Sequence, residues 1–368
     1  MKHVMVVMGT RPEAIKLCPL IMELKRRKTM QITVCSTGQH REMLDGAMRA
    51  FSVRADCDLN VMQTGQRMSM VTSRILSGMD EVLERYSPDL VVVQGDTATA
   101  FGAAFSAFYR KIPIGHVEAG LRTYHIRSPF PEEFHRQTIS MMADFHFAPT
   151  VAAKNNLLRE EKNEKTIFLT GNTVVDALRY TLKYGKTNTR HTFSQNSRLI
   201  LFTAHRRENL GETMRGMFRA LRSIVESHAD VVAVCPLHPN PEVRAVAREI
   251  LYGCSRIEMI EPLETVDFHR LLARSTLVLT DSGGIQEEVT ALGIPTLVMR
   301  YSTERTEGIR AGCLRLVGSG EAGIVHVANQ LLEKNSKEYA AMKRPSNVFG
   351  DGRASVRIAN ILERLLRV

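Results

Sequence analysis

The sequence predicts an α/β protein built from two similar halves, and three observations indicate this. Short runs of β-branched and apolar residues alternate with longer amphipathic segments along the chain of 368 residues. The short runs are apolar throughout, as in parallel strands that helices cover on both faces. The alternation is interrupted by one polar stretch, residues 183–198, and then restarts.

The expected elements alternate in both halves. In the first half, strands are expected at 3–8, around Val34, at 90–94 and at 112–117. Helices are expected between them at 12–27, 68–86 and 98–110. In the second half, strands are expected at 198–205, 231–236, 256–260, 276–280 and 295–299. Residues 354–366 have the apolar spacing of a final helix.

The polar stretch indicates a linker or an exposed segment, so a domain boundary is expected between about 170 and 195. Two Rossmann-like halves would leave a cleft between them, and ligands commonly bind in such clefts.

Composition limits the class of protein. Apolar residues make up 44% of the chain and charged residues 24%, which excludes a disordered chain. The 49 Lys and Arg exceed the 39 Asp and Glu, so the net charge of +10 favours anionic partners. No nucleic-acid motif accompanies this charge, and the absence of Trp disfavours a stacking platform for single strands. No apolar run reaches the length of a membrane span, and the N-terminus is interpreted as a buried strand rather than a signal peptide.

Metals and redox cofactors are not expected. The six cysteines are scattered without a C-x-x-C pair, which is typical of a reducing compartment. The 12 histidines form no metal-binding spacing. No G-x-G-x-x-G follows the first expected strand, which disfavours a dinucleotide.

The loop GTRPEAIK, residues 9–16, lies between an expected strand and an expected helix. Gly9 permits a tight turn, and the start of a helix favours anions. Arg11 and Lys16 add positive charge there. An ordinary connecting loop with solvated charges is an equally good interpretation.

The segment TDSGGIQEE, residues 280–288, occupies the same kind of position in the second half. Its small residues would let a phosphate approach the backbone N–H groups of Ser282, Gly283 and Gly284. A carboxylate one turn into the helix, as at Glu288, can bind ribose hydroxyls. The alternative is that Ser282 simply caps the helix, although the paired glycines favour phosphate binding.

Acidic residues follow successive expected strands. Asp96 follows the strand at 90–94, Glu118 follows the one at 112–117, and Glu132 and Glu133 come after Pro131. Ligands of open α/β sheets bind beyond the carboxyl ends of the strands, so these acids could share a site and act as general acid and base. The alternatives are that Asp96 caps the next helix and that the paired glutamates favour a helix start.

Three further motifs carry basic residues. His205 and Arg206 lie at the end of the strand expected at 198–205 and suit phosphate contact or proton transfer. His238 lies in a proline-rich turn, where a structural role is favoured. Arg305 could pair with a phosphate or with a neighbouring Glu.

Taken together and in order, these motifs resemble those of the non-hydrolysing UDP-N-acetylglucosamine 2-epimerases, and the likeness runs nearly end to end. The motifs are GTRPEAIK, TGQHREML, GDTATAF, HVEAGLRT, PFPEEFHRQ, ADFHFAPT, TGNTVVDAL, HRRENLGE, HPNP, DSGGIQEE and TERTEG. The resemblance implies a GT-B architecture. It implies one domain of residues 1–172 joined by a last helix at 353–368, and a UDP-binding domain of residues 173–352. It also implies a cytoplasmic homodimer that needs no metal or nicotinamide and that serves cell-surface polysaccharide synthesis.

The reaction implied by this resemblance is the reversible interconversion of UDP-GlcNAc and UDP-ManNAc, through elimination of UDP to 2-acetamidoglucal and its re-addition. The implied acid–base residues are Asp96, Glu118 and Glu132, with His205 near the diphosphate. The residues implied to contact phosphates are Arg11, Lys16, Arg305, Ser282, Gly283 and Gly284. The residues implied to border the ribose and uracil are Glu288, Leu263 and Phe268.

Some positions depart from the family pattern. His135 stands where Asn is usual, Tyr301 where Asp is usual and Thr306 where Pro is usual, so a modified UDP-HexNAc is an alternative substrate. Many bacterial members bind a second, activating UDP-GlcNAc, for which Gln39, Arg206 and His238 match. Glu42 and Gly65 replace the usual Gln and Arg of that site. Replacing a cation and adding an acid should weaken a diphosphate sugar there.

Two other functions remain as alternatives. A GT-B glycosyltransferase would need an acceptor-binding region in the first half, where the carboxylates and the GTRPE loop favour epimerisation instead. A UDP-sugar-binding protein without turnover is disfavoured by the intact set of acids.

Overall fold

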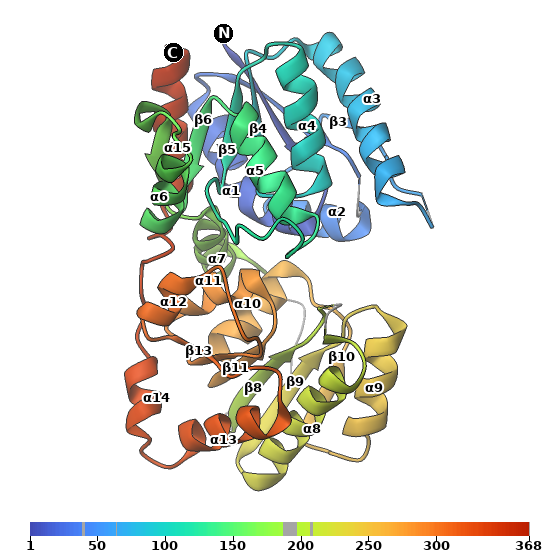
Figure 1. The fold of residues 1–368 in the computed structure, drawn as a ribbon, viewed down its shortest axis with the longest axis vertical. Helices are drawn as coiled ribbons and strands as arrows, with labels where there is room; N and C mark the ends of the chain where they lie inside the picture. Colours follow the sequence, from blue (N-terminus) through green and yellow to red (C-terminus); the bar gives the residue numbers. More distant parts are fainter. Residues whose placement is uncertain (39–40, 64, 187–196, 207–208, 368) are drawn as a thin grey trace. The chain divides into compact units, whose positions relative to one another are not determined.

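Parallel strands and helices alternate along the chain and form two separate sheets, which confirms the predicted α/β class with two Rossmann-like halves (Figure 1). The computed structural model describes residues 1–38, 41–63, 65–186, 197–206 and 209–367, with the backbone alone for residues 41 and 42. Unit 1 contains residues 1–184 and 350–368, and unit 2 contains residues 185–349.

Unit 1 is built on a seven-stranded parallel sheet with the order β3-β2-β1-β4-β5-β6-β7. Its strands are β1 (His3–Met8), β2 (Gln31–Ser36), β3 (Cys57–Asp58), β4 (Leu90–Gln94), β5 (Ile114–Val117), β6 (Phe145–Ala148) and β7 (Ile167–Leu169). Its helices are α1 (Arg11–Arg27), α2 (Arg41–Ala50), α3 (Met68–Tyr86), α4 (Ala98–Tyr109), α5 (Glu132–Met142), α6 (Val151–Arg159), α7 (Thr173–Tyr184) and α15 (Ala354–Leu366), with a 3₁₀ turn at Glu164–Thr166.

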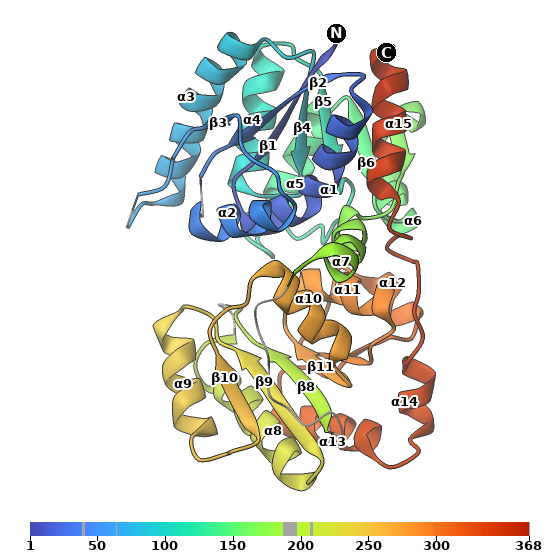
Figure 2. The same ribbon diagram turned by 180° about the vertical axis from the view of Figure 1, so that it is seen from behind.

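The central strands of unit 1 are buried on both faces, which explains their continuous apolar sequences. On β1, Val4, Val6 and Met8 pack with α1, α2 and α15. The alternate residues Met5 and Val7 pack with α3 and α4 on the other face. Figures 1 and 2 show these two helical layers from opposite sides.

Helix α7 and the C-terminal helix α15 both pack on α1, so unit 1 continues to Tyr184 rather than ending near residue 172 (Figure 2). The buried Asp176 of α7 accepts hydrogen bonds from the first amides of α15, Ala354 N at 3.1 Å and Ser355 N at 2.8 Å. Arg27 at the end of α1 pairs with Glu363, with 2.6 Å between Nη1 and Oε2. These contacts fix the last helix to unit 1.

Unit 2 repeats the same plan with six parallel strands in the order β10-β9-β8-β11-β12-β13. Its strands are β8 (Arg198–Thr203), β9 (Val231–Pro236), β10 (Ile257–Ile260), β11 (Leu277–Thr280), β12 (Thr296–Val298) and β13 (Leu314–Leu316). Its helices are α8 (Glu212–Ser227), α9 (Pro241–Leu251), α10 (Thr265–Arg274), α11 (Gly283–Leu292), α12 (Thr306–Arg310), α13 (Glu321–Leu332) and α14 (Lys337–Met342). Helices α8, α9 and α13 cover one face of this sheet, and α10 and α11 cover the other.

The strand orders place a topological switch point in each unit. The chain leaves β1 and β4 of unit 1 in opposite directions across the sheet, and β8 and β11 occupy the same positions in unit 2. In open α/β sheets, ligands bind beyond the carboxyl ends of the strands at this point. Within the described ranges, no helix is both long and apolar enough to cross a membrane.

Candidate functional site

Glu118 directly follows β5 and has a left-handed backbone conformation with φ of 65°. Such a conformation is unfavourable for a residue with a side chain and is concentrated at functional sites. The Glu118 carboxylate is buried and accepts hydrogen bonds from Lys16 Nζ and Gln94 Nε2. A Cβ placed on Gly95 would be 3.9 Å from Glu118 Oε2. The Glu118 carboxylate therefore lies beside the turn at Gly95, the residue before Asp96.

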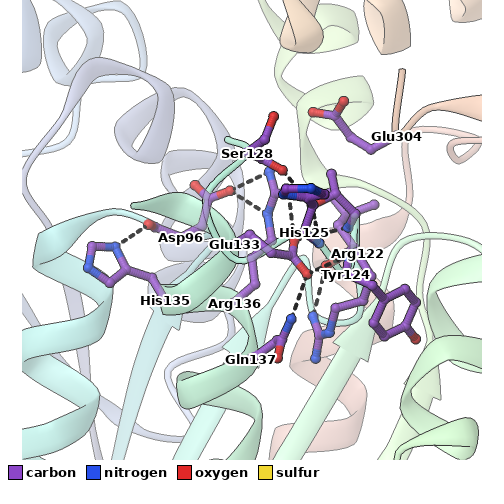
Figure 3. Close-up of polar contacts among 12 residues, drawn as sticks. Asp96, Arg122, Tyr124, His125, Ser128, Glu133, His135, Arg136, Gln137 and Glu304 are labelled. Atoms are coloured by element: carbon purple, nitrogen blue, oxygen red, sulfur yellow. Dashed lines mark hydrogen bonds and ion pairs between the residues drawn. The ribbon is translucent and has the colours of Figure 1, made fainter. Parts of the chain in front are cut away.

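Asp96, after β4, is held by α5 (Figure 3). Arg136 Nε and Nη2 each lie 2.7 Å from Asp96 Oδ2. Arg136 also donates to Glu133, which is fully buried and accepts the backbone N–H groups of Thr123 and Tyr124, each at 3.0 Å. Thr97 is the N-cap residue of the helix that follows, and its Oγ1 accepts from Ala100 N at 3.0 Å.

Glu132 is the first residue of α5 and is partly exposed. One turn further, His135 donates from Nδ1 to the backbone oxygen of Asp96 at 2.8 Å and stacks on Phe101, with ring centroids 5.0 Å apart. Burial lowers the pKa of this imidazole below its usual range. The start of α5 therefore lies at the Asp96 loop, and unit 1 brings Asp96, Glu118 and Glu132 to one edge of its sheet.

The loop between β1 and α1 is held by a buried carboxyl group. Glu13 is completely buried, and its Oε2 accepts Gly9 N at 3.0 Å, Thr10 N at 2.8 Å and Thr10 Oγ1 at 2.8 Å. Its Oε1 accepts Thr97 Oγ1 at 2.6 Å. Burial raises the pKa of Glu13 to about 7, against the opposing effect of these donors. Arg11 begins α1 in this loop, and Lys16 lies further along the same helix.

Two neutral histidines lie beneath this edge on neighbouring strands. His116 of β5 donates from Nε2 to Gly95 O at 2.8 Å, and burial lowers its pKa to about 4. His146 is its partner on β6, and burial lowers its pKa to about 3. The His116 bond fixes the turn that precedes Asp96.

In unit 2, the buried carboxylate of Asp281 follows β11 and organises the loop after β8. It accepts the backbone N–H of His205 at 3.1 Å, that of Arg206 at 3.0 Å and Asn209 Nδ2 at 3.0 Å. His205 Nδ1 lies 3.1 Å from Asp281 Oδ1. Burial would raise the pKa of Asp281, but the bonds from His205 and Arg206 outweigh it and the pKa falls below its usual range.

Helix α11 begins immediately after Asp281 with Ser282 as its N-cap residue, although the Ser282 side chain makes no capping bond. Gly283 lies against Arg305, since a Cβ there would be 2.9 Å from Arg305 Nη1. At Gly284 a Cβ would meet open space. Arg305 donates from Nε to Glu287 at 3.1 Å and from Nη1 to Glu304. The first turn of α11 thus combines N–H groups, small residues and a nearby guanidinium.

The other expected nucleotide contacts lie on α10 and α11. Glu288 is buried, and 3.2 Å separate its Oε1 from Nε2 of His269. Leu263 and Phe268 are partly buried and pack on the same apolar cluster as Ile285 and Val289 of α11. The structure therefore brings Leu263, Phe268 and Glu288 to neighbouring elements of unit 2.

Of the residues expected at a second ligand site, Gln39 lies outside the described residues. Arg206 donates from Nε to the backbone oxygen of Asp281 at 2.9 Å. The ring of His238 stacks on that of His205, with centroids 5.9 Å apart. Gly65 is exposed, and a Cβ placed on it would meet open space. Arg206 and His238 therefore lie next to the residues of the Asp281 loop.

Among the positions that depart from the family pattern, Tyr301 is 81% exposed and lies over Gly318. Thr306 is the first residue of α12, a position that also suits Pro. Within the described part of the chain, no three His, Cys, Asp or Glu side chains gather in an arrangement that could hold a metal ion.

Sequence reasoning missed Glu13 and Asp281. Glu13 carried a signal, because Thr10 and Glu13 have the spacing of a capping box, T-x-x-E. Asp281 carried the same signal as Asp96, an acid directly after an apolar strand. The sequence places Glu133 among the acids of a possible site, but nothing in it specifies the backbone N–H groups that Glu133 accepts.

Comparison with known proteins gives one consistent result. Residues 22–363 match the family model described as UDP-N-acetylglucosamine 2-epimerase. The chain is 49% identical over 359 residues to a UDP-N-acetylglucosamine 2-epimerase of Bacillus subtilis, covering 98% of this chain and 94% of that protein.

Solved structures agree with this match. The crystal structure of UDP-GlcNAc 2-epimerase from Neisseria meningitidis, bound to UDP-GlcNAc, has a TM-score of 0.94 and 43% identity, with all of both chains covered. A UDP complex of an S. aureus protein has a TM-score of 0.93 and 44% identity, covering 100% of this chain and 97% of that one. These matches confirm the GT-B architecture.

Proposed function

Because this chain belongs to the UDP-N-acetylglucosamine 2-epimerase family, we propose that it interconverts UDP-GlcNAc and UDP-ManNAc without net hydrolysis. A base removes the proton at C2 of the sugar while the bond from C1 to the UDP oxygen breaks, and the C1–C2 double bond of 2-acetamidoglucal forms. UDP then adds back at C1, and a proton is delivered to C2 on the opposite face.

The observation that carries the proposal is the set of carboxylates at the switch point of unit 1. Elimination and re-addition on two faces require an acid and a base, which Asp96, Glu118 and Glu132 supply in the proposed mechanism. The strained backbone of Glu118 and its buried bonds to Lys16 and Gln94 support a catalytic role. Arg11 and Lys16 are proposed to neutralise the phosphate side.

The first turn of α11 is proposed to bind the diphosphate through Ser282, Gly283 and Gly284, assisted by Arg305. In unit 1, by contrast, the amides of Gly9 and Thr10 already donate to Glu13. This difference supports UDP binding in unit 2, with Glu288 on the ribose and with Leu263 and Phe268 bordering the uracil. His205 is proposed to assist the departure of UDP.

Incubation of the enzyme with UDP-GlcNAc alone in deuterated water tests the proposal. We expect deuterium at C2 of both UDP-GlcNAc and UDP-ManNAc, because the proton at C2 is lost and replaced from solvent. A glycosyltransferase or a binding protein would leave C2 unlabelled. A panel of modified UDP-HexNAc sugars in the same assay separates the alternative substrates.

Glu288→Gln is expected to weaken UDP binding by about ten- to a hundred-fold, as for loss of a charged hydrogen bond worth ~1.5–3 kcal/mol. The affinity for pyrophosphate should change less than about two-fold, because the lost contact is to the ribose. Calorimetric titration of both ligands measures this difference. An equal loss for both ligands would contradict a ribose contact.

A homodimer is also part of the proposal, and an exposed aromatic surface supports it. Phe108 and Tyr109 of α4 and Phe134 and Met141 of α5 are between 41% and 75% exposed. Phe101 and Phe105 connect Tyr109 with Phe134 through ring contacts of 4.5–5.8 Å. Large apolar patches on soluble proteins mark interfaces. A second copy of unit 1 is the proposed partner of this surface.

Tyr109→Asp combined with Met141→Asp is therefore expected to convert a dimer into a monomer, as measured by sedimentation equilibrium. Tyr252→Asp, at a position 83% exposed in unit 2, is the matched control and should remain dimeric. A dimer that survives the double substitution would exclude this surface.

Regulation by a second UDP-GlcNAc is proposed to be weak, because Gly65 offers no cation and Glu42 adds an acid. We expect UDP-ManNAc, freed of UDP-GlcNAc, to be converted from the first seconds without a lag. Glu42→Gln should increase the response to a trace of UDP-GlcNAc. A lag in the wild type that this trace abolishes would show a working second site.

A cytoplasmic location completes the proposal. All six cysteines are unpaired, which supports a reducing compartment.

A further inference from the structure

Glu13 connects two loops of unit 1 that are far apart in sequence. Its Oε2 holds the Gly9–Thr10 turn through three donors at 2.8–3.0 Å, and its Oε1 accepts the hydroxyl of Thr97 at 2.6 Å. The side chain is completely buried. One carboxylate therefore bridges the loop after β1 and the loop after β4, on the two strands that flank the switch point.

We infer that Glu13 is a positioning residue for the proposed reaction. By holding Thr10 and Thr97, it fixes the neighbouring residues Arg11 and Asp96 relative to each other. Arg11 is the proposed phosphate contact, and Asp96 belongs to the proposed acid–base set, so the inference rests on the proposed function. A displacement of about 1 Å in such a group can lower a rate about a hundred-fold.

The polarity of this connection requires a carboxylate. All four groups that contact Glu13 donate to it, and the two backbone N–H groups cannot reverse their direction. Thr97 Oγ1 also accepts the Ala100 amide at 3.0 Å, so its proton is directed to Glu13. A glutamine of the same size would place an N–H₂ group against this hydroxyl. Its oxygen could still accept from the turn, but the connection to Thr97 would be lost or reversed.

The same contacts limit what the first loop can offer a ligand. Since the amides of Gly9 and Thr10 donate to Glu13, these two N–H groups are not available to a ligand. Glu13 thus occupies the position that a bound anion would take at the start of α1. The glutamate of the GTRPE sequence, Glu13, thus has a positioning role and does not itself contact the substrate.

The experiment compares four variants of the full-length enzyme with the wild type: Glu13→Gln, Thr97→Val, Thr97→Ser and the double variant Glu13→Gln/Thr97→Val. Turnover and KM are measured with UDP-GlcNAc, and the affinity for UDP is measured by calorimetry. Thr150→Val is the matched control, because Thr150 caps α6 through an equivalent bond to Ala153 N at 3.1 Å.

We expect Glu13→Gln and Thr97→Val each to lower kcat about ten- to a hundred-fold. The kcat of the double variant should be no lower than that of the less active single variant, because both substitutions break the same hydrogen bond between Glu13 and Thr97. Thr97→Ser should retain nearly full kcat, and Thr150→Val should leave it unchanged. The affinity for UDP should change less than about two-fold in Thr97→Val and Thr97→Ser, because Glu13 still holds the turn before Arg11 in both.

Three results would overturn the inference: wild-type kcat in Thr97→Val, additive losses in the double variant, or an equal loss of kcat in Thr150→Val. If Glu13→Gln does not fold, the Thr97 variants and their control still decide it. Failure of the proposed function itself is distinguishable, because the wild type would then give no epimerisation.

Discussion

Replacing Asp96 by Asn, Glu118 by Gln or Glu132 by Gln is expected to lower turnover by about 10²–10⁴-fold, the usual contribution of a general acid or base. Each substitution keeps the size of the side chain and removes its ability to exchange a proton. The measurement is the initial rate of deuterium incorporation at C2 of UDP-GlcNAc, with the folded state checked by circular dichroism and UDP binding.

Loss of an ion pair is a competing explanation for such an effect, because Asp96 and Glu118 both contact cations. Glu160→Gln separates the two explanations. Glu160 forms a two-pronged pair with the buried Arg122, at 2.7 and 2.8 Å, but is not in the proposed acid–base set. We expect this variant to lose some stability and to keep wild-type exchange. Near-wild-type exchange in all three acid variants would remove these carboxylates from the mechanism.

The fold was predictable where strands are long and buried on both faces. The predicted strand at 90–94 has the same bounds as the observed β4, and the predicted helix at 354–366 has the same bounds as α15. The strands β3, β6, β7 and β13 were missed. Each has four residues or fewer, and β6 and β13 contain a polar residue, His146 and Arg315. Strands this short depend on pairing with a neighbour rather than on their own sequence.

The candidate site was predictable to the extent that parallel strands bring their carboxyl ends to one edge. This rule led from the sequence to Asp96 and Glu118, which lie at neighbouring strand ends in the structure. The supporting groups did not follow from it. Glu13 and Thr97 are 84 residues apart, and His205 and Asp281 are 76 apart, so each pair exists only once the sheet has formed.

Asp281→Asn is expected to lower turnover by about 10²–10³-fold through its effect on His205. The carboxylate lies 3.1 Å from His205 Nδ1 and so favours the ring form with the proton on that nitrogen. An amide N–H₂ at this position would favour the opposite form, and a wrong imidazole tautomer is costly in proton transfer. Because His205 is proposed to assist the departure of UDP, the elimination step should slow while UDP affinity changes little.

Asp281 also holds the backbone of His205 and Arg206, so a loss of stability must be separated from a loss of chemistry. Each donor left unpaired by the substitution costs about 1–3 kcal/mol. Asp176→Asn is the matched control, because Asp176 is a buried acid that accepts two backbone N–H groups, and no histidine is among its partners in the described part of the chain. It should lower the melting temperature without lowering kcat. If Asp281 acts through His205, the double variant Asp281→Asn/His205→Asn will be no slower than His205→Asn alone. A multiplicative loss would instead give Asp281 a role of its own in the reaction.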